Sequence, residues 1–336
     1  MMRIAIDAMG GDRGPRDIIA GALAAARHLP IGLVLVGARA EIGRELERHP
    51  DHFALDVQVV DADDVVGMAE APAAALRRKP RASIKVAVET VARGDAAAVF
   101  SAGNTGATVI AAYTAFGMLP GVDRPALATA IPTRLHPAIL LDAGANAECR
   151  PSHLVQFAAM GTVYARIALG ILQPRIALLS IGEEETKGND LTREAHRLLK
   201  ARTPNFIGNI EARDVYTGEA DVIVCDGFTG NIALKISEGL VEMVEGLLGD
   251  ELARSTRAAT DSLARRRAFR RLRKRVDYSE YGGAPLVGVA GLSIVGHGRS
   301  SVKAVRNAVV MAHRFATGDF VRRVEQEIAT VGVPGE

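Results

Sequence analysis

Short apolar runs rich in Val, Ile and Leu alternate along the chain with longer Ala-rich stretches whose apolar positions repeat at helical spacing. The short runs predict strands at 3–7, 32–37, 55–62, 97–102, 126–131, 138–142, 175–182, 205–210 and 221–227. The longer stretches predict helices at 15–29, 39–49, 84–93, 104–118, 151–170, 190–201 and 301–329. Continuous apolar strands that alternate with helices are typical of a mostly parallel sheet covered by helices on both faces. The predicted fold class is therefore α/β.

One segment departs from this alternation. From Asn231 to Tyr278 the chain has only helical sequence, and residues 265–275 carry eight basic side chains in eleven positions. We interpret 231–280 as a helical hairpin that projects from an α/β catalytic body made of 1–230 and 281–336. Its basic half has two interpretations, a solvated helix face or a contact with anionic lipid or an acidic partner protein.

Composition narrows the class of protein further. The 336 residues are 48% hydrophobic with a formal net charge of +2, which suits neither a disordered chain nor a histone-like nucleic-acid binder. Two cysteines without metal-type spacing exclude a disulfide framework and favour a reducing compartment. The longest uncharged segment, 101–122, contains Asn, Thr and Gly, so it predicts a buried helix rather than a membrane span. We expect a cytoplasmic protein.

Five turns at the predicted strand ends are unusually rich in Gly, Asn, Asp and Thr. They are DAMGGDRGP (7–15), SAGNTGA (101–107), LDAGAN (141–146), SIGEEETKGND (180–190) and DGFTGNIALK (226–235). Ligands of open α/β sheets bind beyond the carboxyl ends of the strands, where such turns lie. The turns are therefore the first place to look for chemistry.

The turns at 101–107 and 226–235 share one design, in which an apolar strand, a short turn and Thr-Gly lead into an apolar helix. Free N–H groups and the helix dipole make such a turn an anion site, although it also suits an ordinary capped helix. Lys187 and Lys235 favour phosphate as the anion. Neither turn has a Walker A or GxGxxG motif, which argues against ATP and NAD.

Candidates for a covalent nucleophile are poor. Cys149 and Cys225 have no neighbouring histidine, and there is no GxSxG motif. Glu183–Glu185 is weak as a metal site because consecutive side chains cannot all face one ion. His297 follows a short apolar strand and has two open roles, an acid, base or anion donor or a structural hydrogen-bonding group.

Taken as a set, the motifs resemble the PlsX family of phosphate acyltransferases from residue 4 to about 310. The resemblance rests on IAIDAMGGDRGP (4–15), SAGNTGA (101–107), LLDAGAN (140–146), QFAAMGTVYA (156–165), LLSIGEEETKGN (178–189), FIGNIEARD (206–214), DVIVCDGFTGNIALK (221–235) and YGGAPLVGVAG (281–291). The stretch 132–140 departs from the family pattern because it lacks a glycine. Arg299 stands where the family has a small residue, and 251–275 is more basic than is typical.

The resemblance implies transfer of a fatty acyl group from acyl carrier protein to inorganic phosphate, giving acyl phosphate for phosphatidic acid synthesis. It also implies an α/β fold like that of isocitrate and isopropylmalate dehydrogenases and phosphotransacetylases, and a homodimer held peripherally at the inner face of the membrane. Direct attack by phosphate on a thioester requires no metal, cofactor or covalent nucleophile. Three alternatives remain: a phosphotransacetylase acting on coenzyme A thioesters, a related NAD-dependent dehydrogenase, and a membrane-recruited scaffold.

This chemistry assigns roles to the residues of the turns. The predicted catalytic residues are Lys187, Lys235, His297 and Asn146. The predicted phosphate- or substrate-binding residues are Asp7, Gly10, Gly11, Asp12, Gly103, Asn104, Thr105, Gly106, Asn189, Asp226, Gly227, Thr229, Gly230 and Asn231. The predicted contacts with the carrier protein or an anionic membrane are Arg270, Arg271, Arg273 and Lys274.

Overall fold

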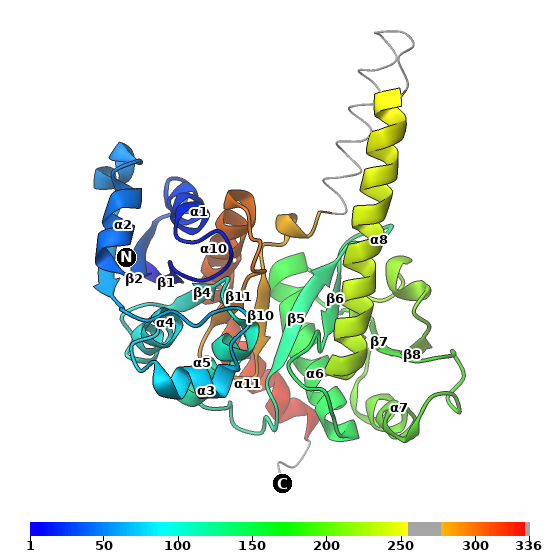
Figure 1. Ribbon diagram of the computed structural model, residues 1–336. Helices are drawn as coiled ribbons and strands as arrows, with labels where there is room; N and C mark the ends of the chain where they lie inside the picture. The colour runs from blue at the N-terminus through cyan, green and yellow to red at the C-terminus, as the bar shows by residue number, and fades with distance from the viewer. Residues whose placement is uncertain (255–276, 333–336) are drawn as a thin grey trace.

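The computed structural model describes residues 1–254 and 277–332, and it confirms the α/β class (Figure 1). Its strands are β1 (Met2–Asp7), β2 (Ile31–Gly37), β3 (Val57–Asp61), β4 (Ala98–Ser101), β5 (Ala126–Ile131), β6 (Ala138–Leu141), β7 (Ile176–Leu179), β8 (Phe206–Ile210), β9 (Val222–Val224), β10 (Ala284–Val287) and β11 (Ser293–Val295). Its α-helices are α1 (Arg16–Ala26), α2 (Arg39–Leu46), α3 (Pro72–Arg78), α4 (Ser83–Ala92), α5 (Thr105–Phe116), α6 (Pro151–Tyr164), α7 (Asp190–Arg202), α8 (Gly227–Arg254), α10 (Val302–Thr317) and α11 (Phe320–Val331).

The strands form one sheet in the order β3-β2-β1-β4-β11-β10-β5-β6-β9-β7-β8. Two parallel halves, β3-β2-β1-β4-β11 and β6-β9-β7-β8, are joined through β10 and β5, whose pairings are antiparallel. Between β4 and β9 the strand direction reverses three times, at the pairs β11–β10, β10–β5 and β5–β6. The carboxyl ends of the two halves therefore lie at opposite edges of the sheet.

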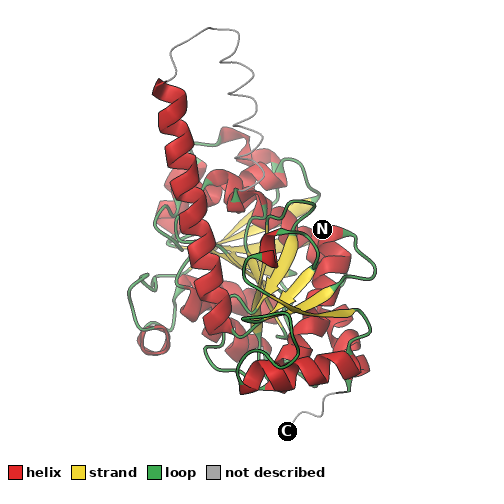
Figure 2. Cartoon of the chain, turned by 90° about the vertical axis from the view of Figure 1, so that its right-hand side faces the viewer, coloured by secondary structure: helices red, strands yellow, loops and turns green. Residues whose placement is uncertain are grey.

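Helices cover both faces of the sheet, as Figure 2 also shows. Successive strand side chains alternate between the two layers. Ile4 and Ile6 of β1 pack into the cluster that includes α1, α6, α10 and α11, whereas Ala5 packs into the cluster that includes α3, α4 and α5. The burial of both faces explains why the strands are continuous apolar runs.

Helix α8 extends well beyond the body of the molecule (Figures 1 and 2). It continues through Gly246 and Gly249 to Arg254, so neither glycine ends it. It begins at Gly227 and covers the part of the chain that was predicted as the first arm of the hairpin. Most of the predicted second arm lies outside the described residues, and the domain boundaries remain a prediction.

The fold differs from the sequence prediction at several places; no strand was predicted at β10, for example. The helix predicted over 301–329 is two helices, α10 and α11, because Asp319 adopts a left-handed backbone conformation with φ of 54°. The short helix α3 was not predicted from the sequence. Within the described part of the chain, none of the helices has the length and hydropathy needed to cross a membrane.

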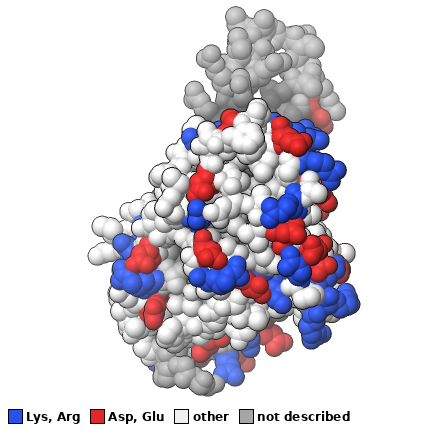
Figure 3. Space-filling view, turned by 90° about the vertical axis from the view of Figure 1, so that its left-hand side faces the viewer, with Lys and Arg blue, Asp and Glu red and all other residues white. Residues whose placement is uncertain are grey.

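Figure 3 views the molecule from the side that lies at the left in Figure 1, where α2 is found. Lys and Arg side chains are interspersed there with Asp and Glu side chains. Arg27–Asp51 and Arg81–Asp63 are examples of ion pairs in the N-terminal part of the chain, to which α2 belongs. A surface of mixed sign does not offer the continuous basic stripe that binds nucleic acid.

Candidate active site

Two groups of turns lie where neighbouring strands send their helices to opposite faces of the sheet. The first turn group comprises 7–12, 101–106 and 296–300, at the ends of β1, β4 and β11. The second turn group comprises 142–146, 180–190 and 225–231, at the ends of β6, β7 and β9. Such switch points are where open α/β sheets form ligand crevices.

The first turn group is tightly packed around Asp7. The Ser101 hydroxyl donates to Asp7 Oδ2 at 2.6 Å, and the Gly103 N–H donates to Ser101 Oγ at 3.1 Å. A Cβ at Gly10 would lie 2.7 Å from Asp7 Oδ2 and 2.8 Å from the Gly103 nitrogen, so only glycine fits there. The Asp12 N–H donates to the Gly298 carbonyl at 2.8 Å, which ties the turn after β1 to the turn after β11.

Asp7 is 2% exposed, and its Oδ1 has no hydrogen-bond partner in the described part of the chain. Burial raises the pKa of this carboxyl group above its ordinary value, while the hydrogen bond from Ser101 opposes the shift. Ser101, which links Asp7 to Gly103, was not singled out from the sequence because its role depends on contacts across two strands.

Asn104 is used by the fold rather than left open for a ligand. Its side-chain oxygen caps α5 by accepting from the Ala107 N–H at 3.0 Å. Its side-chain nitrogen lies 3.1–3.2 Å from the carbonyl oxygens of residues 67, 68 and 70. The N–H groups of Thr105 and Gly106, by contrast, have no acceptor among the described residues. The start of α5 therefore retains two backbone donors.

The second turn group is organised by Asp142, which is fully buried. Its Oδ1 accepts from the N–H groups of Leu127, Gly144 and Ala145 at 2.9–3.0 Å. Its Oδ2 accepts from both the backbone and the side-chain nitrogen of Asn146 at 2.8 Å. The sequence signal for Asp142 is an Asp that directly follows a buried strand and precedes a Gly-rich turn, as in an Asx turn.

Asn146 has both of its amide hydrogens committed, because its side-chain nitrogen also donates to the Pro125 carbonyl at 2.7 Å. Asp226 is likewise structural, since its carboxylate accepts from the N–H and the hydroxyl of Thr229 at 2.9 and 2.8 Å. A Cβ at Gly230 would lie 1.9 Å from the Asp142 carbonyl oxygen, and one at Gly227 would lie 2.5 Å from the Asn146 carbonyl oxygen. These residues build the turn, and in this structure they present no free side-chain donor.

The exposed polar side chains of the second turn group include Glu183, Glu184 and Thr186, and also Lys187 and Asn231. Neither the Lys187 ammonium nor the Asn231 amide has a hydrogen-bond partner among the described residues. Asn231 lies against Gly144, and a Cβ built on Gly144 would be 3.3 Å from the Cβ of Asn231. Lys235 instead pairs with Glu238 at 2.9 Å, and Asn189 caps α7 by accepting from the Thr192 N–H at 2.9 Å.

The structure thus brings the predicted residues together in two groups rather than one. Asp7, Gly10, Gly11, Asp12 and residues 103–106 join His297 in the first group; Asn146, Lys187, Asn189, Lys235 and residues 226–231 form or adjoin the second. His297 is exposed, and its Nδ1 accepts from the Arg299 N–H at 3.2 Å. Arg270, Arg271, Arg273 and Lys274 lie outside the described residues.

The two groups border the same layer of the molecule, although they lie at opposite edges of the sheet. Helices α5 and α8 follow the two Thr-Gly turns, and both contribute to one apolar cluster. That cluster contains Ala107 of α5, and Leu234 of α8 packs against it. It also contains Ala143, which is next to Asp142.

The two cysteines are unsuited to covalent catalysis. Burial raises the pKa of the Cys149 thiol to about 11, and it raises the pKa of the fully buried Cys225 thiol as well. A thiol is nucleophilic mainly as the thiolate, so both are inert at neutral pH.

The mixed sheet with glycine-rich turns at its strand ends is an α/β fold that also occurs in solved phosphotransacylases. It is similar to a phosphotransacetylase from Streptococcus pyogenes, with a TM-score of 0.66 and 17% identity over 94% of each chain. It is also similar to a branched-chain phosphotransacylase from Enterococcus faecalis V583, with a TM-score of 0.61 and 15% identity over 94% of this chain and 99% of that one. At these identities the likeness concerns the fold alone.

Sequence comparison places the chain more closely. Residues 2–323 match the family described as "Fatty acid synthesis protein". The chain is 46% identical to a phosphate acyltransferase of Geobacter sulfurreducens over 98% of its length and 95% of the relative's. It is 49% identical to one of Nitratidesulfovibrio vulgaris (strain DP4) over 97% and 94%. The chain belongs to this family, the PlsX family, and the prediction of an acyltransferase from its sequence is confirmed.

Proposed function

We propose that the chain transfers a fatty acyl group from the thioester of acyl carrier protein to inorganic phosphate, for phosphatidic acid synthesis. A phosphate oxygen attacks the thioester carbonyl carbon, the carbon–sulfur bond breaks, and the carrier thiolate leaves and takes up a proton. The products are acyl phosphate and free carrier protein. The observation that carries the proposal is that, among the described residues, donors suited to an anion stay unused in each turn group: the Lys187 ammonium in the second, and the N–H groups at the start of α5 in the first.

Phosphate requires positive charge, which favours the second turn group as its binding site. The Lys187 ammonium offsets one negative charge of the phosphate, and the Asn231 amide donates a further hydrogen bond. Charge-assisted hydrogen bonds of this kind are roughly twice as strong as neutral ones. Lys235 is already paired with Glu238, so it contributes less than Lys187.

The acyl carbonyl oxygen requires neutral, fixed donors where negative charge develops in the transition state. The N–H groups of Thr105 and Gly106 meet that need, and the dipole of α5 adds to them. The Asp7–Ser101–Gly103 hydrogen bonds hold the turn that positions these groups. Asn146, whose amide is committed to Asp142 and Pro125, does not serve as the oxyanion donor in this proposal.

Most of the rate enhancement comes from holding phosphate and thioester in line. Proximity contributes about 7–11 kcal/mol in well-oriented reactions, and a thiolate needs little help to leave. The mechanism therefore needs no acyl-enzyme, which agrees with the raised pKa values of Cys149 and Cys225.

The proposed assembly is a homodimer joined through α8. On one face of this helix Ile232, Ile236, Leu240, Met243 and Leu247 are all exposed, with spacings of three or four residues. A continuous exposed apolar stripe on a projecting helix is typical of a protein interface. In the proposed homodimer, a second copy of the chain covers this stripe.

The basic residues 270–274 are proposed as the contact with the acidic carrier protein or with an anionic membrane surface inside the cell. Changing Arg270, Arg271, Arg273 and Lys274 to Glu should weaken binding to the carrier or to anionic vesicles at low salt. Unchanged binding to both would remove these residues from either contact.

The alternative donor is a coenzyme A thioester, which the phosphotransacetylase-like fold makes the natural comparison. The test is a steady-state assay of palmitoyl carrier protein against palmitoyl-coenzyme A, each with inorganic phosphate, following the freed thiol. We expect kcat/KM for the carrier substrate to be higher by at least tenfold. Equal or better turnover of the coenzyme A thioester would favour the alternative.

A further inference from the structure

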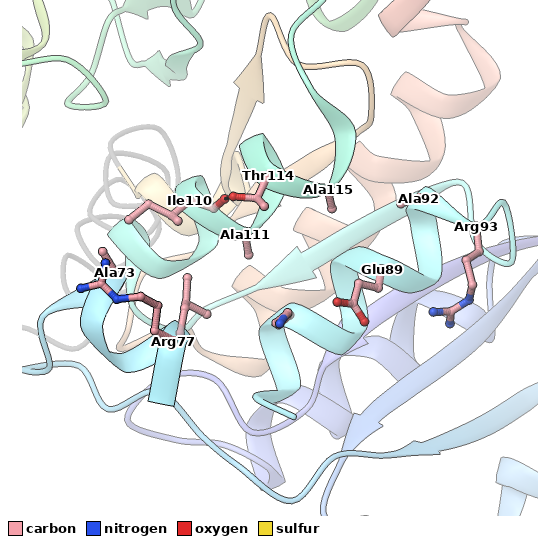
Figure 4. Close-up of a pocket in the computed structure, with 11 residues that line it drawn as sticks. Ala73, Arg77, Glu89, Ala92, Arg93, Ile110, Ala111, Thr114 and Ala115 are labelled. Carbon is pink, nitrogen blue, oxygen red and sulfur yellow. Dashed lines mark hydrogen bonds between the residues drawn. The ribbon is translucent and has the colours of Figure 1, made fainter. Parts of the chain in front are cut away.

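Helices α3, α4 and α5 enclose a groove of about 680 Å³ that the proposed reaction does not yet use (Figure 4). This volume is within the range of about 300–1,000 Å³ found for small-molecule sites. Its apolar lining is Ala73 and Leu76 of α3, Ala92 of α4, and Ile110, Ala111 and Ala115 of α5. Four of these six side chains are alanines, so the helices leave space where larger residues would have filled the seam.

The groove begins next to the start of α5. Pro72, the neighbour of the lining residue Ala73, packs so closely on Gly106 that a Cβ there would lie 2.6 Å from the Pro72 Cγ. Ile110 is one helical turn beyond Gly106, and Ala115 is roughly 13 Å further along the axis than Gly106 at 1.5 Å per residue. A molecule held at the free N–H groups of Thr105 and Gly106 would pass Pro72 and enter the groove about one helical turn further along α5.

Charged side chains border the groove without filling its apolar floor. Arg77, Lys85, Glu89 and Arg93 also line it, and Figure 4 shows Arg77 on α3, Glu89 on α4 and Arg93 just after the end of α4. Arg93 pairs with Asp95, whereas Arg77, Lys85 and Glu89 form no ion pair within the described residues. Long charged side chains of this kind cover a bound alkyl chain with their methylene groups while their heads stay in water.

We propose that this groove binds the alkyl chain of the acyl substrate and so sets the chain-length preference of the enzyme. The inference rests on the proposed function, because it takes the thioester carbonyl to lie at the start of α5. A long flexible alkyl chain fits the groove better than a compact polar ligand, since its floor is apolar and it runs lengthwise along α5.

The test fills the groove and compares two chain lengths. Ala92→Phe and Ala115→Phe place a ring in the groove from α4 and from α5, and Ala92 is exposed, so its substitution does not disturb the core. Ala40→Phe, at an exposed alanine of α2 outside the groove, is the matched control. Each variant is assayed with palmitoyl and butyryl carrier protein at saturating phosphate.

We expect both groove variants to lower kcat/KM for the palmitoyl substrate at least tenfold, while kcat/KM for the butyryl substrate stays within twofold of wild type. The control should match wild type with both substrates. Equal losses for the two chain lengths, or no loss for either, would overturn the groove assignment.

A separate readout distinguishes this inference from the proposed function. If wild-type protein turns over neither substrate, the proposed function fails, and the groove is judged by direct binding of a fluorescent sixteen-carbon fatty acid. Wild type and Ala40→Phe should bind that probe, and Ala92→Phe should weaken it at least tenfold. Absent binding, or equal binding by all three proteins, would contradict an alkyl-chain site.

Discussion

Lys187 differs from its neighbours in that its ammonium is exposed in a polar turn and has no acceptor among the described residues. We predict that Lys187→Ala raises the phosphate KM or lowers kcat by roughly 10- to 150-fold, because a hydrogen bond to a charged group contributes about 1.5–3 kcal/mol. Steady-state kinetics with varied phosphate measure the change. Lys200→Ala is the control, since Lys200 lies on the nearby helix α7 and its ammonium is already paired with Glu185. Wild-type constants for Lys187→Ala would remove this residue from the site.

Asp7 contributes a pH dependence whose sign follows from its burial. Because its pKa is raised above 3.8 in the folded protein, the folded state holds this proton more tightly than the unfolded state. Its contribution to stability is therefore largest below pH 3.8 and is lost as the pH rises through the raised pKa. Asp7→Asn has no carboxyl group to titrate at this position. Between pH 3.8 and the raised pKa, the unfolding free energy of this variant should therefore rise relative to that of wild type, and above the raised pKa the difference should stay constant. Urea titrations from pH 3.5 to 8 test this, and a difference that is constant over that whole range would contradict it.

Cys149 and Cys225 test whether an acyl-enzyme forms. With the pKa of Cys149 at about 11 and that of Cys225 also raised, neither thiol is ionised at pH 7.5. We predict that the double variant Cys149→Ser, Cys225→Ser keeps kcat within about threefold of wild type, and that mass spectrometry finds no acylated wild-type cysteine during turnover. Loss of activity in a folded double variant, or a trapped thioester on either residue, would show a covalent route.

At the scale of elements, α8 carries the prediction about assembly. Ile236 and Leu240 are 66% and 51% exposed, one turn apart on the same face. Ile236→Asp or Leu240→Asp should raise the dimer dissociation constant at least about 30-fold, as expected for a ~2 kcal/mol interface residue. Glu242→Lys, off that stripe, should leave it unchanged. Analytical ultracentrifugation measures this, and a dimer that tolerates both Asp variants would place the interface elsewhere.

The elements themselves could be predicted from local pattern to different degrees. Buried strands such as β2 and β7 were predicted because apolar β-branched runs between polar turns have few other interpretations. The break between α10 and α11 was missed because the residues on both sides have helical periodicity, while the break itself depends on the left-handed backbone of Asp319. Helix α3 is too short for its periodicity to stand out.

The site could be predicted as a set of turns but not as a set of contacts. The glycine-rich turns at strand ends are visible in the sequence, since they follow apolar runs directly. Which amides are free is not visible, because the commitments of Asn104 and Asn146 depend on carbonyl groups more than twenty residues away. The grouping of the turns depends on strand directions, which no local pattern determines.

At the scale of the whole molecule, the sheet places two polar turn groups around one apolar layer, with α5 and α8 on the same face. We propose that both groups act in one reaction, with phosphate beside Lys187 and Asn231 and the acyl carbonyl at the start of α5. Family membership gives the class of reaction. The positions of the free donors are the reason why we assign phosphate to the second turn group and the developing oxyanion of the acyl carbonyl to the first.

The most direct test is an assay of the purified protein with palmitoyl carrier protein, with and without inorganic phosphate, following acyl phosphate and free carrier thiol together. We predict phosphate-dependent release of both products in equal amounts, with palmitoyl-coenzyme A poorer by at least tenfold. Thiol release that does not depend on phosphate, or no turnover by a folded protein, would contradict this prediction.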